Sequence, residues 1–237
     1  MSTAPAIAPE YSSKASRRST HFVLRRLHSL TGIIFGGYLV IHLLVNATLA
    51  QGGNIFQLQV DKIHSLPFLA VVETIFIYLP ILYHTVYGVW VTLSGQPNVL
   101  HYPYGKNIFY FLQRISALII VLFMVFHILG MKGVFGTNLQ FVPEKYALES
   151  VKWHFQQHWS VLYLIYPIGV LASCYHLANG FWAAAITWGL TITEKAQRRW
   201  GFVCFGLFLL TLGCGLLALY GVMKITPLDS KPPWLQG

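Results

Sequence analysis

Charged residues are scarce in this chain. Of its 237 residues only 10% are charged and 55% are hydrophobic, and the mean hydropathy is +0.57. A soluble domain normally carries about 25% charged residues. The composition therefore excludes an ordinary water-soluble protein and indicates that lipid covers most of the surface.

Cysteine is also rare, and its three residues, Cys174, Cys204 and Cys214, all lie in apolar segments. They form neither a disulfide framework nor a CxxC metal motif, so we interpret them as small buried hydrophobes. The N-terminus lacks the apolar core of a signal peptide. Residues 1–20, rich in Ala, Ser and Pro, are expected to form a soluble arm.

Long hydrophobic runs are what the chain has in quantity. Five segments reach the roughly 20 residues that a membrane-spanning helix needs, and we place them at 27–49, 67–93, 108–131, 159–188 and 201–223. The fold class predicted is an all-α membrane protein in which the first four helices form a bundle. The predicted organisation is an N-terminal arm (1–20), a five-helix transmembrane domain (21–224) and a C-terminal tail (225–237).

The net charge of +9 arises from basic residues in the loops, which favours membrane topology over nucleic-acid binding as its origin. One side of the membrane receives ten of them: Lys14, Arg17, Arg18, Arg25, Arg26, Lys106, Arg114, Lys195, Arg198 and Arg199. The other side receives six: Lys62, Lys132, Lys145, Lys152, Lys224 and Lys231. The positive-inside rule then predicts a multi-pass protein of the cell's inner membrane, with its N-terminus inside and its C-terminus outside.

Four of the ten histidines lie deep inside separate predicted helices: His42, His84, His127 and His176. An ionisable residue inside a membrane helix is costly and is by default a candidate for function. Any one of them alone is equally well explained as a neutral histidine bonded to a neighbouring helix. Their relative depths decide between these readings.

Two of these histidines are level near the outer face. His42 lies 16 residues beyond Arg26, and His127 lies 13 residues beyond Arg114. At 1.5 Å per residue these separations are about 24 Å and 20 Å from the inner face, in a hydrocarbon core about 30 Å thick.

The other two are level near the inner face, because their helices run in the opposite direction. His84 follows Pro67, and His176 follows Trp159, by 17 residues each, or about 25 Å inward. Level histidines on facing helices supply the two axial nitrogens that a haem needs. Zinc would ordinarily require about four ligands at one height. The sequence therefore predicts two haems b, each held by a histidine pair.

Small residues and a proline accompany these histidines. Gly88 lies four residues after His84, and Gly32 lies in the first helix. Such glycines either let a flat macrocycle approach the backbone or serve ordinary helix packing. Pro80 leaves a carbonyl without its helical partner, and that carbonyl is a candidate acceptor for the second ring N–H of His84.

At this point the residues resemble a known family. The runs RRLHSLTG (25–32), IHLLVN (41–46), LPILYHTVYGV (79–89), LQRISALI (112–119), VFHI (125–128) and CYHLANGFWAAAITWG (174–189) look like the first four helices of the five-helix, dihaem cytochrome b subunit of succinate dehydrogenase and fumarate reductase. The resemblance covers about residues 22–190. It implies that His42 and His127 hold the haem distal to the catalytic subunits, and that His84 and His176 hold the proximal one.

The resemblance also implies partners and a reaction. A flavoprotein subunit and an iron–sulfur subunit would bind on the inner side, and electrons from succinate would pass through two haems b to a membrane quinone, usually menaquinone. This chain has no flavin motif and no cysteine cluster, so those centres must belong to other subunits. Two alternatives stay open: a dihaem anchor of another quinone-linked respiratory oxidoreductase, and a haem-free transporter.

Two further sites are predicted around the histidine pairs. His28 and Ser29 lie at the level of the inner haem beside Arg25 and Arg26, where they are candidate donors to haem propionates. The arginines are equally explained as membrane anchors.

Glu73 lies about 9 Å into the second helix. It is the candidate residue of a quinone or proton site beside the outer haem, with His158 on the matching face of the fourth helix. The alternative is a protonated Glu73 bonded to a carbonyl or a propionate.

Overall fold

The computed structural model describes residues 9–95, 99, 101–132, 141–143, 145–228 and 232, and these residues form helices and connecting turns without any strand. The elements in chain order are α1 (Pro9–Ala47), η1 (Thr48–Ala50), α2 (Gly53–His64), α3 (Leu69–Glu73), η2 (Thr74–Tyr78), α4 (Leu79–Ser94), α5 (Gly105–Lys132), α6 (Ala147–Gln156), η4 (Val161–Ile165), α7 (Tyr166–Thr187) and α8 (Glu194–Lys224). The predicted all-α membrane fold is confirmed.

Five stretches in the described part of the chain are long and apolar enough to cross a membrane: 20–50, 69–94, 105–131, 161–187 and 194–224. The first and last begin seven residues before the predicted spans, because hydropathy marks the apolar part of a helix and not its polar ends. At the start of α8, the Thr193 hydroxyl accepts a hydrogen bond from the Ala196 backbone N–H at 3.2 Å, which caps the helix.

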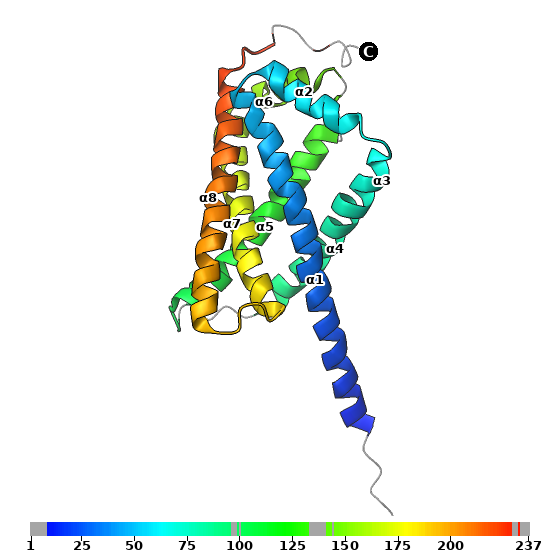
Figure 1. Cartoon of the computed structure of the whole chain (residues 1–237), viewed down its shortest axis with the longest axis vertical. Coiled ribbons are helices and arrows are strands. Elements are labelled where there is room, and N and C mark those ends of the chain that lie inside the picture. Colours follow the sequence, from blue (N-terminus) through cyan, green and yellow to red (C-terminus); the bar gives the residue numbers. More distant parts are fainter. Residues whose placement is uncertain are drawn as a thin grey trace, which may run out of the picture.

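Part of the predicted N-terminal arm is helical. Residues 9–20 continue α1 without a break, and Figure 1 shows α1 extending well past the rest of the bundle at the end where α7 turns into α8. Residues 1–8 lie outside the described part. We call the end of the bundle at which α7 turns into α8 the loop end.

The second and fourth spans each contain a π-helical turn just before a proline. η2 (Thr74–Tyr78) precedes Pro80, and η4 (Val161–Ile165) precedes Pro167. A proline has no N–H to donate and its ring crowds the preceding turn, so a widened turn at this point relieves both problems.

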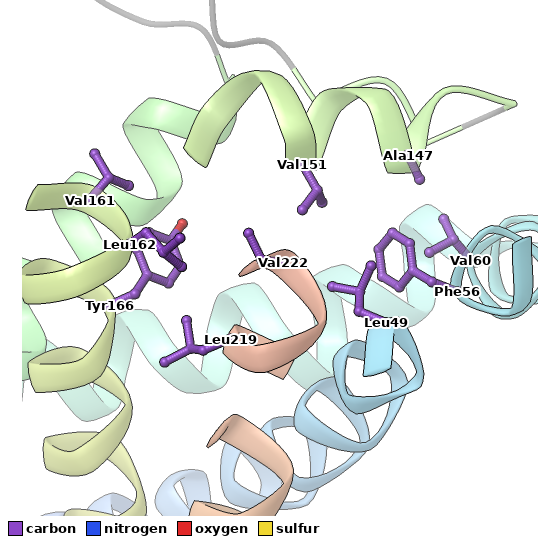
Figure 2. Close-up of a cluster of buried hydrophobic side chains, with 10 residues drawn as sticks. All are labelled: Leu49, Phe56, Val60, Ala147, Val151, Val161, Leu162, Tyr166, Leu219 and Val222. Atoms are coloured by element: carbon purple, nitrogen blue, oxygen red, sulfur yellow. The ribbon is translucent and has the colours of Figure 1, made fainter. Parts of the chain in front are cut away.

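The opposite end of the bundle, which we call the cap end, is covered by α2 and α6 (Figure 1). A cluster of buried side chains joins them to the ends of the long helices (Figure 2): Leu49, Phe56, Val60, Ala147, Val151, Val161, Leu162, Tyr166, Leu219 and Val222. Gln57 of α2 adds polar ties, since its Oε1 accepts from the Leu148 N–H at 3.2 Å and its Nε2 donates to the Pro143 carbonyl at 3.0 Å. The sequence did not predict this cap.

Gly221 fixes how closely α8 approaches η1. A Cβ at this position would fall 2.5 Å from the backbone nitrogen of Ala50, and backbone atoms cannot move aside as a flexible side chain does. We expect Gly221→Ala to destabilise the protein by about 1–3 kcal/mol through overpacking, seen as a lower thermal midpoint in detergent. Gly206→Ala on the same helix, where a Cβ meets nothing within 4 Å, is the control and should be neutral or stabilising. Equal midpoints for the two variants would contradict this account.

Candidate functional site

The four histidines predicted deep inside the membrane helices lie in two pairs. His42 of α1 and His127 of α5 have ring centroids 6.0 Å apart, with an interplanar angle of 82°. His84 of α4 and His176 of α7 have ring centroids 6.2 Å apart, with an angle of 90°. The first pair lies toward the cap end and the second toward the loop end, so we call them the cap-side and loop-side pairs. These are the pairs that the depth count grouped.

The spacing within each pair suits a shared metal ion. A metal–imidazole nitrogen bond is about 2.0 Å long and the ring centre lies about 1.1 Å beyond it, so two imidazoles on opposite sides of one metal have centroids roughly 6.2 Å apart. Within the described residues, no group of three or more His, Cys, Asp or Glu is placed to hold a metal ion. Paired histidines without further ligands fit a planar macrocycle, which supplies the remaining nitrogens itself.

The loop-side pair is oriented by backbone carbonyls. The Nδ1 of His84 lies 2.9 Å from the carbonyl oxygen of His28, and the Nδ1 of His176 lies 3.2 Å from that of Gln113. The Ser116 hydroxyl, which donates to the same Gln113 carbonyl, also lies 3.2 Å from the Nδ1 of His176. A carbonyl only accepts, so each Nδ1 carries the proton and each Nε2 keeps its lone pair. For His84 the acceptor belongs to α1, and not to the carbonyl freed by Pro80 as the sequence suggested.

The cap-side pair is oriented by tyrosine hydroxyls. The Nδ1 of His127 lies 2.9 Å from the Tyr166 hydroxyl, and the Nδ1 of His42 lies 3.4 Å from that of Tyr38. All four histidines therefore use Nδ1 for a second partner, and none of the four Nε2 atoms has a hydrogen bond within the described structure. A metal-ligating imidazole shows this same division between its two nitrogens.

His28 packs directly on the loop-side pair. Its ring stacks on that of His84, with centroids 4.0 Å apart and an interplanar angle of 10°. Two glycines make this possible: a Cβ on Gly32 would lie 2.5 Å from Cε1 of His84, and one on Gly88 would lie 3.1 Å from Cε1 of His28. The Nδ1 of His28 is buried without a hydrogen-bond partner. These two glycines are thus explained by imidazole packing.

Ser29 and Arg26 lie next to His28 at the loop end. The Ser29 hydroxyl accepts a hydrogen bond from the Trp188 indole at 3.1 Å, and the Arg26 guanidinium lies 5.1 Å from the centre of the Trp188 ring. These contacts join α1 to the end of α7. Contact of His28 and Ser29 with propionates stays a prediction.

Glu73 ends α3 and is half-buried. Glu73 lies 11 residues before His84, a separation that would place the two on the same side of a regular α-helix. The π turn η2, which lies between Glu73 and His84, contains one residue more than an α-helical turn. The extra residue rotates Glu73 by roughly 100° relative to the face that carries His84. Glu73 lies on the part of the second span toward the cap end, the end at which the cap-side pair is found.

His158 does not join Glu73 in the described structure. Its ring is exposed, and its Nδ1 pairs with the Ser160 hydroxyl at 2.8 Å. The histidine that is buried at the cap end is His154 of α6, which sequence reasoning passed over. Its side chain is only 1% exposed, and its Nε2 lies 3.0 Å from the Tyr166 hydroxyl.

Burial lowers the pKa of the His154 imidazole from 6.5 to about 4. The ring is therefore neutral at pH 7. The sequence signal for His154 is the amphipathic pattern of residues 147–156, since one face of such a helix turns toward the bundle.

One curated relative is informative. The chain is 33% identical over 202 residues to the succinate dehydrogenase cytochrome b558 subunit of Bacillus subtilis (strain 168), an alignment that covers 84% of this chain and 96% of that protein. No family model matches the chain.

Proposed function

The chain belongs to the family of succinate dehydrogenase cytochrome b subunits, and on this premise we propose that it passes electrons from an iron–sulfur subunit through two haems b to menaquinone. As a member of that family it is a multi-pass membrane subunit of an oxidoreductase complex. The observation that carries the proposal is the presence of two histidine pairs, with ring centroids 6.0 and 6.2 Å apart, at two levels of one bundle.

The residues of this chain hold and orient the haems. His42 and His127 would ligate one iron, and His84 and His176 the other, each through Nε2. Haem iron, when bound, accepts and gives up one electron at a time. The partners on Nδ1 fix the ring orientation and raise the basicity of each ligand. The carbon chemistry of succinate would lie in the flavoprotein subunit.

The basic residues support an orientation with the loop end inside and the cap end outside. The loop-side pair would then receive electrons from the iron–sulfur subunit, and the cap-side pair would deliver them toward the quinone. Glu73 is the proposed proton-relay residue of the quinone site, since quinone reduction takes up protons and a half-buried carboxyl near the cap-side pair can supply them.

Purification of the intact complex tests the whole proposal. We expect flavoprotein and iron–sulfur subunits to copurify, a reduced-minus-oxidised spectrum with haem b bands, and succinate:quinone reductase activity. Copurification with a formate dehydrogenase, hydrogenase or nitrate reductase subunit would replace the proposed partners. Absence of haem from the purified complex would support the transporter reading.

Docking at the loop end gives a separate prediction. The segments 95–107 and 190–200 and the N-terminal arm should cross-link to the iron–sulfur subunit, because these segments lie on the proposed inner side. Lys106 and Glu194, 3.5 Å apart and 65% and 93% exposed, join the two segments at the surface. Cross-linking by mass spectrometry in native membranes is the measurement. Cross-links confined to residues 132–158 would invert the orientation.

A further inference from the structure

A hydrogen-bonded chain links the cap to one of the four proposed ligands. The Nδ1 of His127 lies 2.9 Å from the Tyr166 hydroxyl, and that hydroxyl lies 3.0 Å from Nε2 of His154. The three residues come from α5, α7 and α6. His154 and Tyr166 are almost fully buried, at 1% and 7% exposure.

The chemistry of the three groups fixes the direction of both bonds. If Nε2 of His127 ligates iron, its Nδ1 carries a proton and must donate to the Tyr166 oxygen. The Tyr166 O–H is then free to donate, and Nε2 of His154 is the acceptor. His154 must therefore carry its proton on Nδ1, which is buried and has no hydrogen-bond partner in the described structure. Burial keeps the His154 ring neutral, and only a neutral ring can accept the hydrogen bond from Tyr166.

Aromatic rings surround the hydrogen-bonded series of His127, Tyr166 and His154. The Tyr166 ring lies 4.5 Å from that of Phe155, 5.3 Å from that of Phe123 and 6.4 Å from that of Phe126, between centroids. A Cβ at Gly130 would fall 3.1 Å from Cε1 of His154, so this glycine leaves room for the imidazole. In such apolar surroundings hydrogen bonds are electrostatically stronger than in water, and an unpaired partner is costly.

The loop-side pair has no such link to the cap. Its Nδ1 atoms face the backbone carbonyls of His28 and Gln113. The Nδ1 of His176 also lies 3.2 Å from the Ser116 hydroxyl of α5, and none of these groups belongs to α2 or α6. The cap-side pair is linked to the cap, because the Tyr166 hydroxyl that pairs with His127 also pairs with His154 of α6. Substitutions in the cap can therefore reach one histidine pair and leave the other unchanged.

We propose that Tyr166 and His154 are positioning residues that hold His127 in its ligating orientation and raise its basicity, so that α6 of the cap sets the redox potential of the cap-side haem alone. This inference rests on the proposed function. A hydrogen bond from Nδ1–H gives the imidazole partial anionic character, which favours ferric over ferrous iron. Loss of the bond should raise the potential of that haem.

The test is redox titration of both haems in the purified complex carrying Tyr166→Phe. A net hydrogen bond is worth about 1 kcal/mol, so we expect the ferric-to-ferrous ratio of the cap-side haem at a fixed potential to fall roughly three- to tenfold. The loop-side haem should titrate as in the parent protein. Tyr87→Phe is the matched control, because the Tyr87 hydroxyl is buried without a hydrogen bond in the described structure; it should move neither potential.

A pair of variants at His154 separates positioning from packing. His154→Ala leaves the Tyr166 hydroxyl without an acceptor, so it should raise the potential of the cap-side haem, by less than Tyr166→Phe does. His154→Gln restores an acceptor and should return that potential toward the parent value. A shift in the loop-side haem, or no shift in either haem in Tyr166→Phe and His154→Ala, would overturn the proposal. If Tyr166→Phe fails to assemble, the His154 pair decides alone. A parent complex without haem would refute the proposed function before any variant is compared.

Discussion

Replacing His84 or His176 by Ala should remove one haem b component from the spectrum of the complex and leave the other in place. Replacing His42 or His127 should remove the complementary component. Each variant should retain about half of the haem content per chain, because one axial ligand is too few to hold a low-spin haem b in the bundle. The measurement combines a pyridine haemochrome assay with low-temperature reduced-minus-oxidised spectra.

His158→Ala is the control for these variants, since that ring is exposed and its described contacts are with its neighbours Trp159 and Ser160; it should keep both components. The pairing predicts that the two variants of one histidine pair lose the same haem b component. Loss of the same component in His42→Ala and His84→Ala would show that the pairing is wrong.

Glu73→Gln should strongly reduce quinone reduction while both haems and succinate–dye reductase activity stay intact. The amide keeps the shape of the carboxyl but cannot give up and regain a proton, and general acid–base groups contribute roughly 10²- to 10⁴-fold to rates. We therefore expect succinate:quinone turnover to fall at least about tenfold, measured with a menaquinone analogue in detergent or proteoliposomes.

Asp61→Asn is the matched change at the same end of the molecule, because Asp61 is an exposed carboxylate on α2. Its turnover should equal that of the parent protein. Parent-like turnover in Glu73→Gln would exclude Glu73 from proton delivery and favour a structural carboxyl bonded to a carbonyl or a propionate. Loss of a haem in that variant would point to the propionate.

The histidine pairs were accessible from sequence because depth in a membrane is a one-dimensional quantity. Each helix rises by 1.5 Å per residue from a recognisable end. Counting from Arg26 therefore gives the depth of His42, and counting from Pro67 gives the depth of His84, without knowledge of how the helices cross. The same count says nothing about rotation. The carbonyl that receives His84 Nδ1 comes from His28 on another helix, a contact set by the crossing of α1 and α4.

The cap was missed for a different reason. The segments that form α2 and α6 are short and of mixed polarity, and they were interpreted as loops between spans. Their apolar residues, such as Phe56 and Val151, are buried only because the two helices pack on each other and on the ends of α7 and α8. Without that tertiary partner neither segment has enough apolar surface to be recognised, and His154 and its bond to Tyr166 were missed with them.

The π turn η2 divides the second span into two independently phased segments, α3 and α4. A π turn contains one more residue than the α-helical turn it replaces, so deleting a single residue within η2 would rotate the α3 segment by about 100° and leave α4, with His84, where it is. η4 stands at the start of the fourth span, so a deletion there would change only how the chain enters α7. The position of His84 is therefore insulated from single-residue insertions and deletions within η2, whereas the face that α3 turns toward the bundle is not.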